Sequence, residues 1–182
     1  IGRGCAVVIS ARRRRELDRV AARCREAGAP TAEVVPLDQG DAASIERALR
    51  GALAAPLDVV VLCGGVGSRA AALDTDAATL RRLMETNFLA TAELGRRCAR
   101  HMLEKRRDGR VVVASSVQGY FGLPQRAAYA AQAQEVRARE QRRATRRAAR
   151  RALAIVGRLS LARARSRRLP AHVCLLYTSD AA

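Results

Sequence analysis

The sequence predicts a doubly wound α/β fold with a parallel sheet, and three observations support this prediction. Short apolar runs rich in β-branched residues recur along the first two thirds of the chain, which is typical of strands buried on both faces. Segments with apolar residues three and four positions apart separate these runs, which is typical of amphipathic helices. Strands that alternate with such helices form right-handed βαβ crossovers and therefore a parallel sheet.

The first part of the chain contains two expected strand–helix pairs. Residues 5–10 (CAVVIS) form a short apolar strand, and Ser10 is placed to cap the helix that follows. Gly28 is expected to end that helix, because glycine readily adopts the left-handed conformation found at helix C-termini. Residues 32–38 (AEVVPLD) form the second strand, and Asp41 is expected to cap the second helix.

Two further strands are expected on either side of a long helix. Residues 57–63 (LDVVVLC) form a third strand, which runs into the glycines of GGVG. Apolar residues at helical spacing predict one helix from about residue 75 to residue 107, and residues 110–116 (RVVVASS) form a fourth strand. Ligands of parallel sheets bind beyond the carboxyl ends of the strands, so the residues that end these runs are the candidates for a site.

The composition is that of a single globular domain. The chain has 182 residues, of which 49% are hydrophobic, and no apolar run approaches the ~20 residues that a membrane helix needs. The five cysteines are widely spaced and include no CxxC pair, so neither a metal site nor a disulfide framework is expected. These features favour an intracellular protein with reduced thiols, although a targeting or anchor segment ahead of residue 1 stays open.

The formal net charge of +17 is unevenly distributed along the chain. Residues 1–133 contain 21 Lys and Arg against 14 Asp and Glu, whereas residues 134–182 contain 13 against 3. A basic helix over residues 134–168 that binds nucleic acid or an anionic membrane, carried on a catalytically dead scaffold, is therefore an alternative function. It is not favoured, because this segment has no aromatic residues for base stacking and no groove-reading motif.

Four short motifs occur in order along the first two thirds of the chain, namely VVLCGGVG, METNFLA, ASSVQG and AAYAA. LDQGD ends the second strand, and Ser116 and Tyr129 stand thirteen residues apart. In these features residues 4–131 resemble the short-chain dehydrogenase/reductase (SDR) family. The resemblance implies a Rossmann-type NAD(P)-binding sheet and an oxidoreductase that interconverts an alcohol and a ketone or aldehyde by hydride transfer.

The resemblance also implies roles for individual residues. Tyr129 is expected to act as the acid/base, Ser116 to bind the carbonyl oxygen of the substrate, and Asn87 to serve as the relay residue for protons. Asp38 is expected beside the adenine of the cofactor, and Gly65 lets the chain pass close to that cofactor. Without the resemblance, the tyrosine, serine and asparagine would be interpreted as a packing residue, a cap and a helix residue bonded to the backbone.

The end of the first strand favours NADP as the cofactor. An acidic residue there would bind the ribose hydroxyls of NAD and repel a 2′-phosphate, whereas SARRRRE places Arg12 and Arg13 within reach of that phosphate. NAD stays an alternative, because a run of arginines is also typical of a solvated helix turn. The expected partners are a small alcohol or carbonyl substrate and further copies of the chain, since members of this family usually form homo-oligomers. Tyr120 and Phe121 indicate an apolar ketone, although packing would explain them equally well.

The sequence departs from the family pattern at both ends of the resemblance. The family's first strand and its glycine-rich phosphate turn are expected to be missing, because IGRG leaves no room for a helix before the strand at residues 5–10. This loss would leave edges of that strand and of residues 57–63 unpaired. Ala133 stands where the family has a lysine that activates the tyrosine, so the chain as written is expected to be inactive.

Three segments are therefore expected. Residues 1–131 form a partial Rossmann-type NAD(P)-binding catalytic domain. Residues 132–173 form an Arg-rich helical segment that is expected to be out of frame and unable to pack against the sheet. Its opening Gln-Ala-Gln can be re-read one base later as Lys-His, and out-of-frame GC-rich DNA gives arginine and alanine in excess. Residues 174–182 (CLLYTSDAA) resemble a translated sequencing adapter and are expected to be a non-native tail. If Ala133 is genuine, a pseudoenzyme that keeps the fold for partner binding is the alternative.

Overall fold

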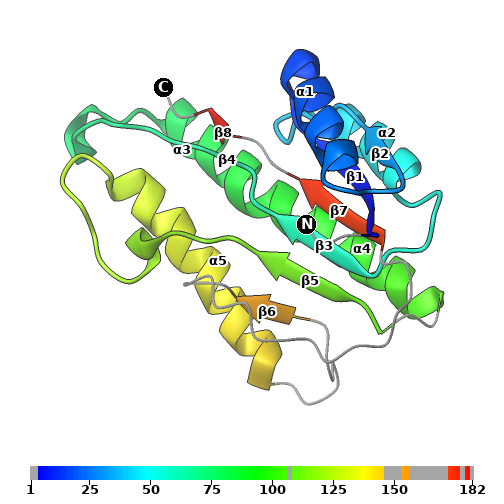
Figure 1. The fold of residues 1–182 in the computed structure, drawn as a ribbon. Helices are drawn as coiled ribbons and strands as arrows, with labels where there is room; N and C mark the ends of the chain where they lie inside the picture. The colour runs from blue at the N-terminus through cyan, green and yellow to red at the C-terminus, as the bar shows by residue number, and fades with distance from the viewer. Residues whose placement is uncertain (1–3, 106–107, 146–152, 156–171, 177–178, 181–182) are drawn as a thin grey trace.

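The structure is a computed structural model that describes residues 4–105, 108–145, 153–155, 172–176 and 179–180. The strands are β1 (Ala6–Ser10), β2 (Ala32–Val34), β3 (Val59–Leu62), β4 (Gly65–Val66), β5 (Arg110–Val113), β6 (Leu153–Ile155), β7 (His172–Leu176) and β8 (Ser179–Asp180). Six of them form a sheet in the order β2-β1-β7-β3-β5-β6, in which the described pairings are parallel, and β4 pairs with β8 (Figure 1). The predicted doubly wound α/β fold is confirmed.

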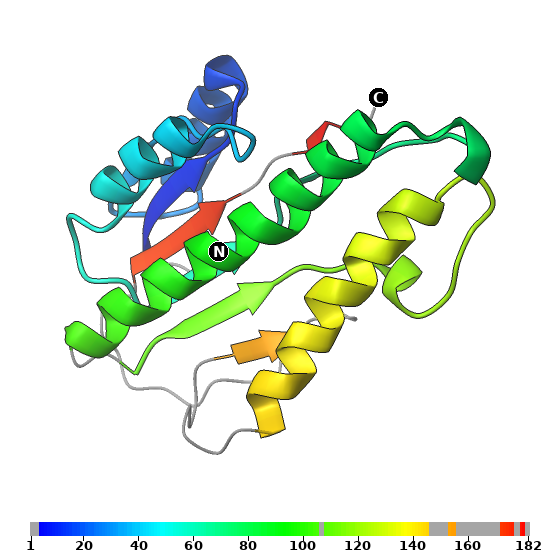
Figure 2. The same cartoon turned by 180° about the vertical axis from the view of Figure 1, so that it is seen from behind.

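Helices cover both faces of the sheet. They are α1 (Arg14–Glu26), α2 (Ala42–Ala52), α3 (Ala77–Leu83), α4 (Ala90–Glu104) and α5 (Ala127–Thr145), with the short helices η1 (Ala72–Asp74), η2 (Met84–Leu89) and η3 (Val117–Gly119) between them. Helix α1 lies on one face, and α4 and α5 lie on the other, as the two opposite views show (Figures 1 and 2). Helix α4 packs closely on β3 and β5, because Gly95 brings its backbone near Leu62 and Val111.

The four predicted strands are confirmed as β1, β2, β3 and β5, but one of the predicted caps is wrong. Asp41 caps α2, since its side chain accepts a hydrogen bond from the Ala43 N–H at 2.9 Å. Gly28 ends α1 with a φ of +93°, as predicted. Ser10, however, is the fully buried last residue of β1, and α1 begins four residues later at Arg14. The strand pairing of Ser10 therefore prevails over its local preference for a cap.

The predicted long helix is continuous in space but changes its winding in the middle. Asp76 caps α3 by accepting a hydrogen bond from the Thr79 N–H at 2.7 Å, and the helical chain continues to Glu104. Between α3 and α4, the segment η2 is a π-helix that contains Asn87. A π-helical turn inserts one extra residue per turn and often marks a functional site.

The expectation of unpaired strand edges between β1 and β3 is wrong. Strand β7, from the C-terminal part of the chain, lies between them and pairs in parallel with both. Strand β7 therefore occupies the position for which the sequence predicted a missing strand. The residues printed after β7, YTSDAA, include no glycine.

Helix α5 packs against the rest of the molecule, contrary to the expectation for the segment after residue 131. Ala130, Ala133 and Val136 are buried, and Val136 belongs to the same apolar core as Val111 of β5. Small residues allow this close approach, which the scarcity of large apolar residues in the sequence did not suggest. A basic helix was considered over residues 134–168. The structure describes its backbone only as far as residue 145, and it does not describe the side chains of its arginines.

Candidate active site

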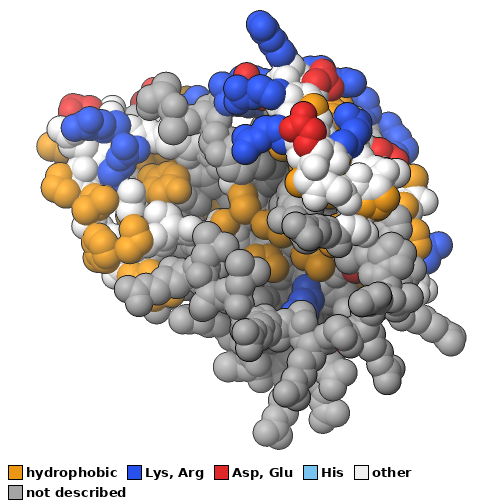
Figure 3. All heavy atoms as spheres, in the orientation of Figure 1, with side chains coloured by type: hydrophobic (Ala, Val, Ile, Leu, Met, Phe, Trp, Pro, Cys, Tyr) orange, Lys and Arg blue, Asp and Glu red, His pale blue; other side chains and the backbone are white. Residues whose placement is uncertain are grey.

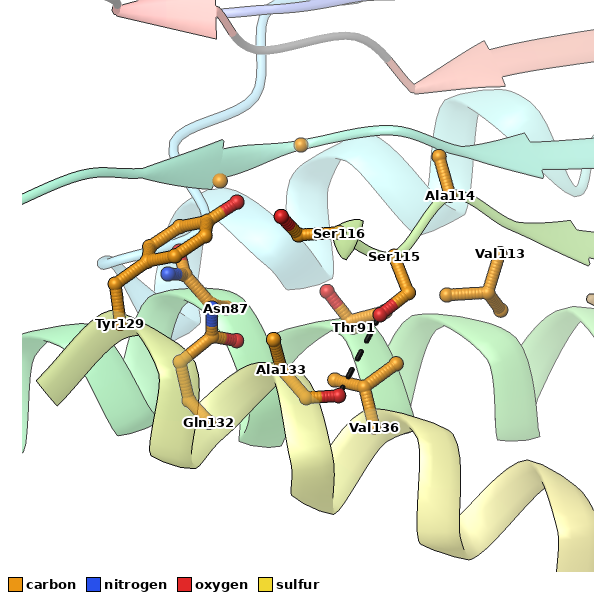
Figure 4. A pocket seen from close by; sticks show the side chains of 12 residues that line it. Asn87, Thr91, Val113, Ala114, Ser115, Ser116, Tyr129, Gln132, Ala133 and Val136 are labelled. Carbon is orange, nitrogen blue, oxygen red and sulfur yellow. Dashed lines mark hydrogen bonds between the residues drawn. The ribbon is translucent and has the colours of Figure 1, made fainter. Parts of the chain in front are cut away.

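A pocket lies at the carboxyl ends of β3 and β5, where the α/β fold places its ligands. Residues from the ends of these strands form one side, and residues from η2, α4 and α5 form the other (Figure 4). The pocket brings together four of the seven predicted site residues, together with the position of the absent lysine, namely Gly65, Asn87, Ser116, Tyr129 and Ala133. The sequence motifs therefore converge on one site although they lie far apart in the chain.

Asn87 fixes the strand β4 on which Gly65 lies. Its Oδ1 accepts a hydrogen bond from the Val66 N–H at 2.7 Å, and its Nδ2 donates one to the Val66 carbonyl at 2.8 Å. A Cβ atom at position 65 would lie only 3.2 Å from Asn87 Oδ1, so glycine permits this approach. Because both polar atoms of the amide bind the backbone, the side chain of Asn87 acts here as a positioning group.

Ser116 and Tyr129 supply the two hydroxyl groups of the pocket. Ser116 is the N-cap of η3, and its Oγ accepts a hydrogen bond from the Gln118 N–H at 3.2 Å. This bond orients the hydroxyl oxygen and leaves its hydrogen available as a donor. Figure 4 shows the hydroxyl of Tyr129, from the first turns of α5, directed toward the space beside the hydroxyl of Ser116. A carbonyl oxygen between them could accept hydrogen bonds from both.

Ala133, at the position where the sequence analysis expected a lysine, is buried in this chain. Ala133 is only 2% exposed, and its carbonyl accepts a long hydrogen bond of 3.5 Å from Ser115 Oγ. A Cβ at Gly119 would lie 3.0 Å from the same carbonyl oxygen, so η3 and α5 are in close backbone contact. The pocket thus contains no cationic side chain among the residues that line it.

Besides Ser115, which adjoins Ser116, two polar residues on the helices of the pocket were not predicted from the sequence. Thr91 lies one helical turn after Asn87, and its hydroxyl accepts a hydrogen bond of 3.3 Å from the buried amide of Gln39. Gln132 lies three residues after Tyr129 on α5 and is buried beside Asn87 (Figure 4). Their spacing of four and three residues from predicted site residues is the signal that could have identified them, because such residues share a helix face.

The three remaining predicted site residues lie at the same edge of the sheet but outside this pocket. Arg12 and Arg13 are exposed between β1 and α1, and Arg13 is the N-cap residue of α1. Asp38 follows β2, where its Oδ1 accepts a hydrogen bond from the Gly40 N–H at 2.8 Å. Strand β7 lies between β1 and β3 and so separates this group from Gly65. The edge therefore has a charged end and a hydroxyl-bearing end.

The loops that follow β4 and β5 meet at one end of the molecule and expose apolar side chains. The Ala70 N–H donates to the Gln125 carbonyl at 3.1 Å, and the Arg126 guanidinium donates to the Ser68 carbonyl at 3.2 Å. Hydrophobic side chains gather at this end of the space-filling view (Figure 3), and the exposed ones in these loops are Leu73, Val117, Tyr120, Phe121 and Leu123. Tyr120 and Phe121 are 60% and 51% exposed, so about half of each residue stays accessible at this end of the molecule.

A buried thiol on α4 predicts that the stability of the fold depends on pH. Burial raises the pKa of Cys98, on α4, from its ordinary value of 9.0 to about 12. Below pH 9 this thiol is protonated in both the folded and unfolded chains, so it makes stability independent of pH there. As the pH rises from 9 toward 12, the unfolded chain loses the proton first, and the folded state is destabilised.

We therefore expect the free energy of unfolding to fall by about 1.4 kcal/mol between pH 8 and pH 10 through this group alone. Urea titrations of the chain and of Cys98→Ala at both pH values measure this contribution, because other titrating groups are common to the two proteins. If the two proteins lose the same stability between pH 8 and pH 10, the prediction is wrong.

A parallel doubly wound sheet with a hydroxyl pair and a close-approaching glycine at its carboxyl edge defines a nucleotide-binding type of α/β protein. A family model described as "short chain dehydrogenase" matches residues 1–138. The chain belongs to the short-chain dehydrogenase/reductase family, as the motifs predicted.

Curated relatives support the same assignment. The chain is 36% identical over 133 residues to human "Dehydrogenase/reductase SDR family member 7", covering 70% of this chain and 39% of that protein. It is 38% identical over 134 residues to "Dehydrogenase/reductase SDR family protein 7-like" of Anopheles gambiae, covering 70% of this chain and 42% of the relative. The chain thus spans about two fifths of the length of these relatives.

Solved structures share the fold. A short-chain dehydrogenase/reductase from Burkholderia phymatum in complex with NAD superimposes with a TM-score of 0.73 at 20% identity, over 84% of this chain and 64% of that one. A gluconate 5-dehydrogenase from Burkholderia cenocepacia in complex with NADP and tartrate gives 0.69 at 26% identity, over 81% and 58%. In the part of the chain that the structure describes, none of the helices has the length and apolar character needed to span a membrane.

Proposed function

We propose that the protein from which this chain derives is an NADP-dependent oxidoreductase that interconverts an alcohol and a ketone or aldehyde. The observation that carries the proposal is the pair of hydroxyls, on Ser116 and Tyr129, that share one pocket with Gly65 at the carboxyl edge of the sheet. A nicotinamide cofactor supplies or accepts the hydride when it is bound. The exposed apolar loop residues Tyr120 and Phe121 favour an apolar carbonyl substrate.

The residues of the pocket would act on the substrate oxygen. During reduction, the phenol of Tyr129 donates its proton to the carbonyl oxygen as negative charge develops there. The hydroxyl of Ser116, held by the Gln118 N–H, donates a hydrogen bond to the same oxygen and stabilises that charge. The two hydrogen bonds of Asn87 to Val66 hold β4, and with it Gly65, against the helix that carries Asn87.

The residues present fit one end of the cofactor and not its middle. Arg12 and Arg13 supply guanidinium groups suited to a 2′-phosphate, and Asp38 supplies a carboxylate near the expected adenine position. The glycine-rich turn that would bind the pyrophosphate has no counterpart after β7. Similar structures include complexes with NAD and with NADP, so the arginines carry the preference proposed here.

The cofactor preference can be measured on the adenosine end alone. We expect 2′,5′-ADP to bind the chain at least about tenfold more tightly than 5′-AMP, because a phosphate paired with arginine adds a charge-assisted hydrogen bond. Ligand-detected NMR titrations measure both affinities.

The double variant Arg12→Ser/Arg13→Ser should bind the two nucleotides equally. The matched control is Arg14→Ser/Arg15→Ser, which removes the same charge from the next two positions, where Arg14 pairs with Asp18 at 3.0 Å. Equal loss of preference in both double variants would show that only the general positive charge matters, which would contradict a 2′-phosphate site.

We further propose that the chain as written does not turn over a carbonyl substrate. It lacks the lysine at position 133 and the phosphate turn, so neither activation of Tyr129 nor fixation of the pyrophosphate is provided. The test follows NADPH oxidation by the purified chain with a panel of apolar ketones and aldehydes. Sustained turnover above the rate without protein would refute this proposal.

The frame of residues 132–173 and the origin of residues 174–182 are part of the same proposal. We propose that residues 132–173 are read out of frame, that residues 174–182 are non-native, and that the parent protein has a lysine near position 133. Resequencing the source transcript around codons 130 to 135 and past codon 173 tests this. A continuous frame that encodes Ala133 would refute it and favour the pseudoenzyme. For the parent protein we expect a homo-oligomer, as is usual in the family.

A further inference from the structure

The segment that includes β4 and the two residues after it is held from two sides. On one side, Asn87 binds the N–H and the carbonyl of Val66, at 2.7 Å and 2.8 Å. On the other side, the guanidinium of Arg126 donates to the carbonyl of Ser68 at 3.2 Å. A Cβ atom at Gly67 would lie 3.4 Å from the same guanidinium nitrogen. This short segment therefore connects the helix that carries Asn87 with the chain around Arg126.

Gln125 joins the same two loops directly before Arg126. Its carbonyl accepts a hydrogen bond from the Ala70 N–H at 3.1 Å, and its side-chain Oε1 accepts one from Arg69 Nε at 3.1 Å. Gln125 thus binds the loop after β4 through both its main chain and its side chain.

The backbone of Gln125 is strained. Its φ is +61°, and within the described part of the chain it is the one residue other than glycine with a positive φ. It is the third residue of a turn over residues 123–126 (LPQR), which the Arg126 N–H closes by donating to the Leu123 carbonyl at 3.2 Å. A proline second and a positive φ third are typical of a type II turn, where glycine is preferred at the third position. Such strain persists only where surrounding contacts enforce it, and it clusters at functional sites.

Arg126 also stands at the start of the helix that carries Tyr129. Its carbonyl accepts a hydrogen bond from the Ala130 N–H at 2.8 Å, which closes the first turn of α5. Tyr129 lies in that turn, and its hydroxyl is directed toward the space beside Ser116 (Figure 4). Because one hydrogen-bonded helical turn fixes the backbone angles of its residues, the place of Arg126 determines where the side chain of Tyr129 begins.

We propose that Arg126 is a positioning residue, which holds Tyr129 at a fixed place relative to Asn87 through the segment after β4. The inference rests on the proposed function, because that function gives the hydroxyl of Tyr129 its role. The strained turn serves the same purpose, since it keeps the main chain before Arg126 against the neighbouring loop. Arg126 does not line the pocket, so it acts through Tyr129 and not on the substrate.

The position of Tyr129 can be followed without a substrate or a cofactor. The chain contains three tyrosines, Tyr120, Tyr129 and Tyr177. Labelling of the full chain with fluorotyrosine gives each of them a fluorine NMR resonance, which Tyr→Phe variants assign. We expect Arg126→Met to shift the resonance of Tyr129, because methionine keeps an unbranched stem but cannot donate to the Ser68 carbonyl. Arg126→Lys keeps a donor and should return the resonance toward its original position.

Hydrogen exchange reports on the contact between the two loops. We expect the Ala70 amide to exchange at least about tenfold faster in Arg126→Met than in the unsubstituted chain. The Ala114 amide, which donates to the Leu62 carbonyl at 2.8 Å, is the internal control and should keep its exchange rate. The matched control variant is Arg81→Met, which removes the same charge from an exposed position on α3 and should change neither readout.

Each result decides the question. A shifted Tyr129 resonance with faster exchange of Ala70 in Arg126→Met, reversed by lysine and missing from Arg81→Met, supports the proposal. An unchanged Tyr129 resonance in Arg126→Met would overturn it, and so would an equal shift in Arg81→Met, which would indicate a general effect of charge. If Ala114 exchange accelerates by the same factor as Ala70 exchange, or if Arg126→Met does not fold, the residue supports the whole fold and the proposal fails.

These measurements are separate from those that test the proposed function. They use neither a nucleotide nor a carbonyl compound, whereas the proposed cofactor preference is measured by nucleotide titration. A chain that binds both nucleotides equally would still show whether Arg126 holds Tyr129 in place, so the two failures are distinguishable.

Discussion

Replacement of Asn87 by alanine is expected to lower the free energy of unfolding by about 3 kcal/mol. The side chain is 6% exposed and makes two short hydrogen bonds, one to the N–H and one to the carbonyl of Val66. Alanine would leave both backbone groups without these partners in a half-buried position. The loss therefore includes the penalty for unsatisfied polar groups in addition to the two bonds themselves.

Two variants make the measurement specific. Glu85→Ala changes an exposed residue in the same π-helical segment and is expected to alter stability by less than about 0.5 kcal/mol. Asn87→Asp keeps an acceptor for the Val66 N–H but places an oxygen against the Val66 carbonyl. Its destabilisation should decrease at acidic pH, where a protonated carboxyl group can donate to that carbonyl.

Urea denaturation of the three variants, compared with the unsubstituted chain, gives the differences in unfolding free energy. An effect of Asn87→Ala no larger than that of Glu85→Ala would show that the Val66 contacts contribute nothing to stability. The role of Asn87 as the group that positions β4 and Gly65 would then fail, together with the geometry proposed for the pocket.

The sequence predicted most of the fold because its signals are local. The apolar runs of β1, β3 and β5 and the cap at Asp41 depend only on neighbouring residues, and each is found where it was expected. The cap predicted at Ser10 was wrong because Ser10 pairs in the parallel sheet as the last residue of β1. No local sequence pattern reveals that pairing. The insertion of β7 between β1 and β3 could not be predicted for the same reason, since the order of strands is a property of the whole sheet.

The pocket shows the same limit for individual residues. Ser116 and Tyr129 were identified by a motif, and the structure brings them together with Asn87 and Gly65. Thr91 and Gln132 belong to no motif, and they enter the pocket only because helices α4 and α5 turn those faces toward it. Their place in the pocket depends on how α4 and α5 pack on the sheet, and no local sequence pattern indicates that packing. For α5, the scarcity of large apolar residues even suggested that the helix would not pack at all.

Replacement of Gly119 by alanine is expected to destabilise the fold by about 2 kcal/mol. A Cβ atom at this position would lie 3.0 Å from the carbonyl oxygen of Ala133 and 3.3 Å from its carbon, which are backbone atoms of α5. A backbone contact cannot be relieved by a side-chain rotation, so η3 and α5 would have to separate. That separation would widen the pocket between Ser116 and Tyr129.

Gly122→Ala is the matched control, because a Cβ atom there meets no atom within 4 Å and its backbone is not in the left-handed region. We expect it to change stability by less than about 0.5 kcal/mol. Thermal or urea unfolding of both variants measures the difference, and exchange of the Gly119 amide, which donates to the Ser116 carbonyl at 3.0 Å, reports on the loop itself. Equal stability of the two variants would mean that α5 does not lie against η3, and the hydroxyls of Ser116 and Tyr129 would then not share one pocket.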